Sequence, residues 1–396
     1  MQQIVLFDVD DNRLDLLPLT FTRPVSAIRV GILTIREKWE RRLPGTYFDQ
    51  TAPYLQVKFP APVLEPADGG VLAIASHLIP TDDLIEAIAL LPLGSRLTSS
   101  GRLLAYRAPR LLPPDRIAGL TEIDYPDTPI AILSLPDIFL INGAQIEADF
   151  ELITRGCQSL PLSPSCTVIG DPSRIFIEEG AQIEGAILNT RGGDIYIGKD
   201  AEVMEGSIIR APFAMCSHSV VNMGTKIYPD TTLGPWCKVG GELNNVVMIG
   251  YSNKAHDGFL GNAVIGEWCN LGAGCVASNL KNDYTPIRLW NYRTRHFAKT
   301  GLQFCGLIMG DHSKAGINTM FNTATVVAVG CNIHGAGFPR NFIPSFSEGG
   351  SAGFNNVSLP KFFDIARRVM ARRHMQLTEA DEAIYHHIFD FAEDFK

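Results

Sequence analysis

A cluster of polar residues, Asn253-Lys254-Ala255-His256-Asp257, interrupts a regular and mostly apolar stretch of the chain. Histidine has an ordinary pKa close to neutral pH, so its side chain is suited to accept and release a proton. A histidine that only holds a loop together through hydrogen bonds is the alternative. The position of His256 at a break in the pattern makes it the main candidate for chemistry.

A second candidate segment, residues 280–306, mixes basic with aromatic side chains. These are Lys281, Arg288, Arg293, Arg295 and Lys299 with Tyr284, Trp290 and Tyr292. Such a mixture suits a nucleotide, because rings stack on the base and cations attract the phosphates. An arm that contacts another subunit is an equally good interpretation. In either case we expect a long insertion on the functional face of a repetitive region.

The elements that flank both segments repeat every six residues. A large apolar side chain, or in one case Ala315, marks each repeat: Ile177, Ile183, Ile197, Val203, Ile209, Val221, Ile227, Leu233, Val239, Ile265, Leu271, Met309, Phe321, Val327 and Ile333. This period is typical of a left-handed parallel β-helix, whose coils have three flat sides. Small residues four positions later, Cys237, Cys269, Cys275 and Cys331 among them, are expected to fill the core beside the aliphatics.

The first 150 residues show a different pattern, strands alternating with helices. We predict strands at Ile4–Phe7, Val71–Ala75 and Ile130–Leu133 and helices at 25–42 and Asp83–Leu91, which indicates an α/β domain. The predicted domains are 1–150 (α/β), 151–340 (β-helix) and 341–396 (a loop and a helical cap).

Two further helices are expected at the carboxyl end, Lys361–Met375 and Glu379–Phe395. Thr378 with Asp381 three residues later forms a near capping box for the second. Because a solenoid needs its open end covered, we predict that these helices cap it. Residues 137–156 are predicted to be a helical connector between the domains.

The bulk composition narrows the partners. The net charge of −8 disfavours nucleic acid, and no apolar run is long enough for a membrane helix. The acidic start, MQQIVLFDVDD, does not fit a signal peptide, and eight cysteines without paired spacing indicate reduced thiols. We therefore expect a cytoplasmic protein.

The segment LLPLT, followed by a basic residue and proline, resembles the first loop of sugar-1-phosphate nucleotidyltransferases. Only the second half of that motif is present, since Asp8-Val9-Asp10-Asp11-Asn12-Arg13 replaces its glycine-rich part. Basic residues that can fork onto phosphates are Arg13, Arg23, Arg29 and Lys38; surface charges are the alternative. Mg²⁺ would accompany nucleotidyl transfer, yet Asp137 and Asp149 fit helix caps or solvated acids better than metal ligands.

The segment NKAHDGFLGNAVIGEWCNLGAGCVASNL, with Gly310–Asn318 further on, resembles the acetyltransferase domain of the bifunctional glucosamine-1-phosphate acetyltransferase/uridylyltransferase family. The resemblance implies His256 as general base, Lys254 on the sugar phosphate and Asn270 on the sugar. It also implies acetyl-CoA as acyl donor, contacted by Asn279 and by the backbone of Gly272, Ala273 and Gly310.

Departures from that family concern the same site. One residue is missing before His256, Phe259 replaces a tyrosine, and residues 227–247 contain no match to the arginine and lysine that bind the sugar phosphate. The substrate is therefore expected to differ.

As a whole the chain resembles a family described as sugar nucleotidyltransferases. We predict a homotrimeric sugar-1-phosphate nucleotidyltransferase/acyltransferase that binds a sugar phosphate and a nucleoside triphosphate. The alternatives are an acyltransferase with a non-catalytic N-terminal domain and a non-catalytic assembly protein. A zinc enzyme of the γ-carbonic anhydrase type is disfavoured, because His218, His256, His312 and His334 lack close spacing.

Overall fold

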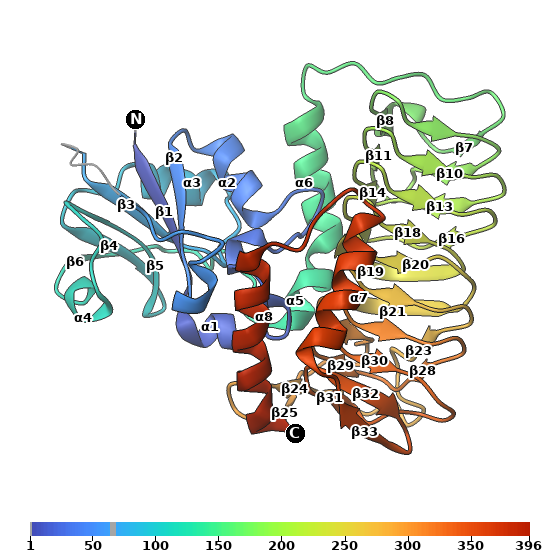
Figure 1. The fold of residues 1–396 in the computed structure, drawn as a ribbon. Helices are drawn as coiled ribbons and strands as arrows, with labels where there is room; N and C mark the ends of the chain where they lie inside the picture. Colours follow the sequence, from blue (N-terminus) through green and yellow to red (C-terminus); the bar gives the residue numbers. More distant parts are fainter. Residues whose placement is uncertain (1, 64–68) are drawn as a thin grey trace. The chain divides into compact units, whose positions relative to one another are not determined.

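The computed structural model describes residues 2–63 and 69–396, which form two compact units (Figure 1). The first unit comprises Met1–Leu16, Thr22–Ile28 and Leu33–Ser134, and the second comprises Leu17–Phe21, Arg29–Ile32 and Leu135–Lys396. No described helix has the length and apolar character needed to cross a membrane.

The first unit is built on a mixed sheet in the order β2-β1-β3-β5-β4-β6. Its strands are β1 (Gln3–Phe7), β2 (Thr46–Gln50), β3 (Val71–Ala75), β4 (Ser95–Ser99), β5 (Arg102–Ala108) and β6 (Thr121–Asp124). Strand β1 runs parallel to both β2 and β3, so the carboxyl ends of these three strands meet at one edge. The helices are α1 (Asp10–Asp15), α2 (Ile35–Arg42), α3 (Asp82–Ala89) and α4 (Pro114–Ile117). The predicted α/β architecture is confirmed.

Two predictions in this region were wrong in extent. The expected helix over 25–42 is a 3-10 turn at Val25–Ala27 and a separate α2, because Gly31 has φ +76° between them. Thr34 then starts α2 afresh with a capping box to Glu37. The expected strand Ile130–Leu133 makes only one bridge, from Ala131 to Leu78.

The second unit contains the predicted left-handed parallel β-helix, with three sides (Figure 1). The first side holds β8 (Ile175–Ile177), β11 (Ile195–Ile197), β14 (Phe213–Met215), β17 (Thr231–Leu233), β26 (Ile308–Met309), β29 (Val326–Val327) and β31 (Phe342–Ile343). The second holds β9 (Gln182–Ile183), β12 (Glu202–Val203), β15 (Val220–Val221), β18 (Lys238–Val239), β20 (Asn253–Lys254), β22 (Asn270–Leu271), β27 (Lys314–Ala315), β30 (Asn332–Ile333) and β32 (Ser347–Gly350), with β33 (Gly353–Asn356) antiparallel at its end. The third holds β7 (Thr167–Ile169), β10 (Ile187–Asn189), β13 (Ile208–Arg210), β16 (Lys226–Ile227), β23 (Val276–Ala277) and β28 (Met320–Phe321). Two long strands, β19 (Glu242–Gly250) and β21 (Phe259–Glu267), continue from the third side onto the first.

The six-residue pattern is the core of this helix. The marked aliphatics and Cys237, Cys269, Cys275 and Cys331 form one buried cluster inside the coils. Burial raises the pKa of Cys237 and of Cys269 to about 12, so these thiols stay protonated and act as small apolar fillers, as predicted.

A column of rings lines the corner between the first and second sides, which we call the aromatic corner. It consists of His218, Trp236, Tyr251, Trp268 and His312, each with φ between 54° and 61°. This left-handed conformation costs a non-glycine residue roughly 1–2 kcal/mol. Stacking offsets part of the cost: the ring centroids of His218 and Trp236, and of Tyr251 and Trp268, are 4.3 Å apart.

Helices cover parts of the coils. Helices α5 (Leu135–Leu140) and α6 (Asn142–Thr154) correspond to the predicted helical connector. They belong to the second unit, where Ile146 of α6 packs on Tyr196 and Ala214. In the structure Leu135–Lys396 belong to the second unit, while the domain boundary expected at residue 150 stays a prediction.

The carboxyl-terminal helices are α7 (Leu359–Ala371) and α8 (Glu379–Ala392), followed by a 3-10 turn at Glu393–Phe395. They run alongside the coils instead of capping the open end (Figure 1): Phe362 near the start of α7 contacts Phe346, and Arg373 after its end lies over Trp236. The apolar target of these helices is thus the aromatic corner. The capping box of Thr378 with Asp381 is present as predicted.

The insertion at 280–306 forms a hairpin of β24 (Arg288–Asn291) and β25 (His296–Lys299). Two of its aromatics are used for packing: Trp290 stacks on Phe342 at 4.1 Å between centroids, and Tyr292 is buried against Phe21 and Phe395. These two rings are therefore not displayed for a nucleotide, whereas Tyr284 is exposed.

Candidate functional site

His256 lies in a surface hollow at the corner between the second and third sides, which we call the histidine corner. Turns of successive coils stack there, and together they enclose about 510 Å³. The lining residues are Asn222, Met223, Gly240, Gly241, Ala255, His256, Asp257, Ala273, Gly274, Ile317 and Asn318. His256 and Asp257 are exposed to solvent, so a ligand in the hollow can reach the imidazole.

The turn that carries His256 is held from two sides. Asn222 donates a hydrogen bond from its amide to the carbonyl oxygen of Ala255 at 2.7 Å. Gly258, at φ +125°, allows close approach to the next coil, since a Cβ atom there would lie 2.0 Å from the Cys275 carbonyl oxygen. The histidine thus projects from a backbone that neighbouring coils fix.

Lys254 does not face this hollow, which corrects the role expected for it. It pairs in register with Val239, an inward position of the second side, and its side chain is 1% exposed. Its ammonium donates hydrogen bonds to the carbonyl oxygens of Gly240, at 3.1 Å, and His256. Burial lowers the pKa of Lys254. Successive side chains of a strand point alternately inward and outward, so the methylene chain of Lys254 lies in the core.

The other residues implied by resemblance lie at different places on the coils. Asn270 is exposed on the second side, where its carbonyl oxygen accepts from Asn253 at 3.5 Å. Asn279, at the corner between the third and first sides, donates to Asn262 at 2.8 Å. Ala273 lines the hollow, and Gly272 precedes it.

Two of the backbone groups expected to meet the pantetheine arm are already used within the coils. The N–H of Gly272 donates to the Ala315 carbonyl at 2.9 Å, and that of Gly310 to the Val327 carbonyl at 2.7 Å. Gly310 lies at the start of the aromatic corner, away from the hollow. Of the site residues that the resemblance implied, His256 and Ala273 are therefore the two that line the same hollow within one chain.

The first unit has a larger cavity, about 760 Å³, at the carboxyl ends of β1, β2 and β3. Its walls are Phe7, Asp8, Val9, Asp10, Asp11, Asn12, Asp15, Gln50, Thr51, Ala52, Pro53, Gln56, His77, Arg102, Leu103, Tyr106, Leu112, Pro114, Ile117 and Leu133. Asp8 ties the three strand ends together: it accepts from Ser76 Oγ at 2.6 Å, Thr51 Oγ1 at 2.5 Å and the Val25 N–H at 3.1 Å. Burial raises the pKa of Asp8 to about 6 despite these bonds.

Two buried polar atoms in this cavity wall have no hydrogen-bond partner among the described residues, Asn12 Oδ1 and His77 Nδ1. The side chains are 8% and 6% exposed, and burial lowers the pKa of His77 to about 4. A neutral imidazole and an amide oxygen facing a cavity are suited to hydrogen-bond a ligand. The sequence offered no motif for these two residues.

The basic residues expected to hold phosphates lie elsewhere. Arg13, on α1, lies over the Tyr54 ring at 5.9 Å, while Arg23 and Lys38 are 5% and 2% exposed. The Arg29 guanidinium, in the second unit, donates to the carbonyl oxygens of Ile249 and Ile32. Among the described lining residues of the cavity, Arg102 is the single arginine or lysine.

The cavity is instead acidic, and it does not fit a preformed Mg²⁺ site. Asp8, Asp10, Asp11 and Asp15 line it, but nowhere in the described ranges do three carboxylate, histidine or cysteine side chains converge as ligands. Asp149, considered as a ligand from the sequence, accepts the Ile32 N–H at 2.8 Å, and Asp137 lies in the first turn of α5.

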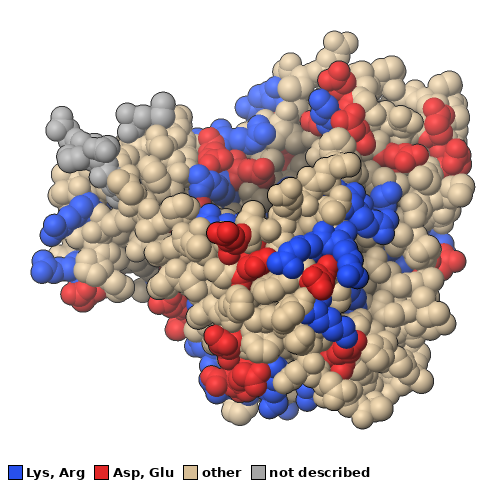
Figure 2. Space-filling model, viewed as in Figure 1, with Lys and Arg blue, Asp and Glu red and all other residues tan. Residues whose placement is uncertain are grey.

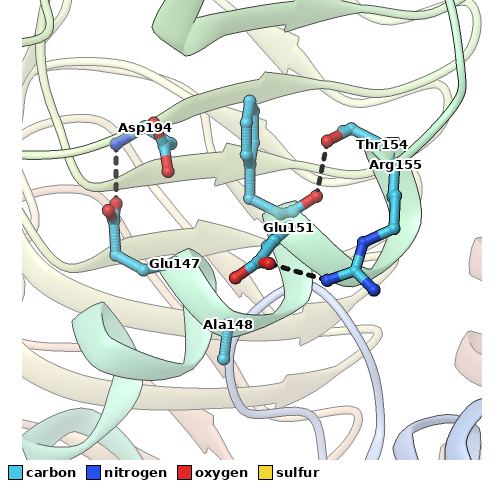
Figure 3. A pocket seen from close by; sticks show the side chains of 7 residues that line it. Glu147, Ala148, Glu151, Thr154, Arg155 and Asp194 are labelled. Carbon is cyan, nitrogen blue, oxygen red and sulfur yellow. Dashed lines mark hydrogen bonds and ion pairs between the residues drawn. The ribbon is translucent and has the colours of Figure 1, made fainter.

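A third hollow, about 490 Å³, lies where α6 meets the coils (Figure 3). Glu147 points to Asp194 and accepts its N–H at 2.6 Å, and Arg174 pairs with both carboxylates at 2.7 Å. Burial raises the pKa of Glu147, and the guanidinium compensates the two acids. These contacts attach α6 to the coils, which accounts for the acidic residues there.

Comparison with known proteins finds a family match in the N-terminal part of the chain and distant relatives. Residues 4–158 match the family model described as sugar nucleotidyl transferase. The bifunctional protein GlmU of Cyanothece sp. is 23% identical over 226 residues, which is 51% of this chain and 46% of the relative. The bifunctional sugar-1-phosphate nucleotidylyltransferase/acetyltransferase of Sulfurisphaera tokodaii is 27% identical over 144 residues, 36% of this chain and 33% of the relative.

The chain thus spans less than half the length of these curated relatives. Among solved structures, the Arabidopsis UDP-N-acetylglucosamine acyltransferase aligns at 13% identity and TM-score 0.23, covering 51% of this chain and 75% of its own. The family match extends over the first unit, where the cavity at the strand ends lies. Residues 4–158 of this chain are therefore similar to the sugar nucleotidyl transferase family.

Proposed function

We propose that this chain is a transferase of sugar-nucleotide biosynthesis whose β-helix transfers an acyl group from acetyl-CoA to a sugar phosphate. The observation that carries the proposal is His256, exposed in a 510 Å³ hollow whose walls are stacked turns of a rigid solenoid. An exposed imidazole on a fixed backbone is suited to act as a general base.

In the proposed reaction, His256 removes a proton from the acceptor amine or hydroxyl. The acceptor's nitrogen or oxygen forms a bond to the acyl carbon of the thioester, the carbon–sulfur bond breaks, and the CoA thiolate leaves and takes up a proton. The imidazolium returns its proton to solvent or to the leaving sulfur. Asn222 contributes by holding the Ala255 carbonyl and hence the turn that aims the ring.

A homotrimer is part of this proposal. Met223 and Ile317, on the rim of the hollow, are 72% and 73% exposed, as suits apolar residues that another copy covers. Residues from a second copy would complete the site, in keeping with the positions of Asn270 on the second side and of Asn279 and Gly310 at two different corners. A cytoplasmic location agrees with eight cysteines that are all free.

Nucleotidyl transfer in the first unit is the second candidate, favoured by the family match over residues 4–158 and by the cavity within it. The apolar side of the cavity, with Phe7 and Tyr106, suits a base or sugar ring, and Asn12 and His77 offer hydrogen bonds. Mg²⁺ is expected of such chemistry in general, but the acids here are not arranged as a metal site, so we assign no step to it.

The two activities are tested separately. Free CoA is measured with acetyl-CoA and a panel of sugar phosphates, for the unchanged chain, His256→Gln and the matched control His296→Gln, an exposed histidine of the hairpin. We expect His256→Gln to lower the rate about 10²–10⁴-fold and the control to leave it unchanged. CoA release that survives His256→Gln would remove the assigned base.

Pyrophosphate release is measured with nucleoside triphosphates and sugar-1-phosphates. Here the cavity variant Asp10→Asn is compared with Asp124→Asn, an exposed acid of β6 outside the cavity. Loss in the first variant alone supports nucleotidyl transfer. Absence of both activities and of stabilisation by any of these ligands would favour a non-catalytic assembly protein.

A further inference from the structure

A basic patch lies where the end of α7 meets the second side of the coils. We define it as Lys238, Arg372 and Arg373 with the amides of Asn253 and Asn270. Figure 2 shows blue side chains gathered over α7 in the second unit. Helix α7 ends at Ala371, so Arg372 and Arg373 are the first residues beyond its last turn.

Arg373 is the centre of the patch. Its guanidinium carbon lies 5.8 Å above the Trp236 ring, and a terminal N–H donates to Asn253 Oδ1 at 3.3 Å. Its Nε is buried and has no acceptor among the described residues. The ring below and the amide beside it fix the guanidinium plane, so its remaining donors have a defined direction.

Among the described residues, no carboxylate forms an ion pair with Arg373. Burial, and next the charge of Arg372, lower the pKa of Arg373. In the described part of the chain, Arg372 and Lys238 also have no ion-pair partner. The nearest outward acid along the side, Glu202, lies two strands from Lys238 with Val220 between them, about 9.6 Å by the usual spacing.

The amides extend the patch along the coils. Lys238, Asn253 and Asn270 are register partners on β18, β20 and β22, one strand spacing apart, and all point outward. Asn253 accepts from Arg373 with its oxygen and donates with its nitrogen to Asn270 at 3.5 Å. Asn270 thereby keeps its own NH₂ group for a ligand.

The patch is close to the histidine corner. Asn253 and His256 are three residues apart on one strand and its following turn, so their Cα atoms are at most about 10 Å apart. A sugar phosphate is of this size. Lys254, the residue implied by resemblance to hold the phosphate, has its ammonium on main-chain carbonyls inside the coil.

From these contacts we infer that the basic patch binds the phosphate of the acceptor substrate, with Arg373 as the principal ligand and Arg372, Lys238 and Asn270 as supporting groups. Guanidinium donors fork onto phosphate oxygens, and because Lys238, Arg372 and Arg373 have no ion-pair partner in the described part of the chain, their charge is free for an anion. The inference rests on the proposed acyl transfer for its choice of a sugar phosphate. The anion site itself does not depend on it.

The test measures binding of pyrophosphate and of glucosamine-1-phosphate to the full chain by calorimetry. Arg373→Gln and Arg372→Gln are compared with Arg210→Gln, which removes the same charge from an exposed position on β13. We expect Arg373→Gln to weaken binding at least tenfold, Arg372→Gln to weaken it several-fold, and the control to change it less than twofold. Arg373→Lys should recover part of the loss, because the charge returns without the fork.

If Arg373→Gln fails to fold, Arg372→Gln decides, since the Arg372 side chain is exposed to solvent. Unchanged affinity in Arg372→Gln, or an equal loss in Arg210→Gln, overturns the inference. Failures of the two proposals are distinguishable. If the patch variants lose phosphate binding but the unchanged chain releases no CoA with any acceptor, only the proposed acyl transfer is contradicted. If CoA release depends on His256 but the patch variants keep the KM for the sugar phosphate, only the proposed phosphate site is contradicted.

Discussion

Replacing Asp8 by asparagine tests whether the buried carboxylate in the cavity wall of the first unit lowers the stability of that unit. The carboxylate sits among three hydrogen-bond donors, yet burial raises its pKa from 3.8 to about 6. Between these two values the folded chain binds more protons at Asp8 than the unfolded chain does. Stability therefore falls as the pH rises from about 4 to about 6.

The magnitude follows from the shift. Two pKa units correspond to about 3 kcal/mol, and the side chain borders an open cavity whose water screens the charge, so about 1–2 kcal/mol is the expected effect at pH 7. Asparagine has nearly the same shape, and its amide can keep the contacts with Ser76 and, by donating, with Thr51. Asp8→Asn should thus stabilise the first unit at pH 7 and have little effect near pH 4.

Hydrogen exchange of β1 and β3 under increasing urea reports on this unit separately from the coils. The control is Asp124→Asn, which removes an exposed acid of the same unit. The reasoning would be refuted if Asp8→Asn lowered the free energy of unfolding of the first unit at pH 7. It would also be refuted if the difference in this free energy between the variant and the unchanged chain were the same at pH 4 and pH 7. Stabilisation together with weaker ligand binding would mark Asp8 as a residue retained for function.

The remaining predictions concern the second unit. Lys254→Ala should lower the free energy of unfolding by about 3 kcal/mol, because it removes three buried methylenes and leaves a void, whereas Lys254→Met should cost under about 1.5 kcal/mol. Urea unfolding measures both, and equal losses in the two variants would contradict the inward placement of Lys254. Gly31→Ala should destabilise the docking of α6 by more than about 1 kcal/mol, because φ of Gly31 is +76° and an added Cβ would lie 2.6 Å from the Gln145 carbonyl oxygen. The control is Gly156→Ala, where φ is +77° but an added Cβ meets no atom within 4 Å, so it shows the strain of a positive φ without the clash. In the native state a thiol reagent should modify the exposed Cys157 quickly and the buried Cys237, Cys269 and Cys331 only on unfolding, which mass spectrometry of labelled peptides would test.

The amino-acid sequence by itself determined the coil. A large side chain every sixth position and a small one four later can be buried together only where short strands turn at fixed intervals, so the pattern predicted the β-helix and the buried cysteines. The α/β character of the first unit followed from local apolar runs in the same way. These features depend on neighbours along the chain, which a sequence displays directly.

The tertiary structure alone decided which residues share a surface. Lys254 and His256 are two positions apart, yet the strand register buries one ammonium inside the coil and leaves the imidazole in the hollow. Asn279 and His256 were read as one site but occupy different corners. Arg373 meets Asn253 across 120 residues because α7 packs along the aromatic corner and not over the open end. Side-chain direction in a coil changes with every residue, and long-range docking depends on packed faces, so no local pattern could have predicted these contacts.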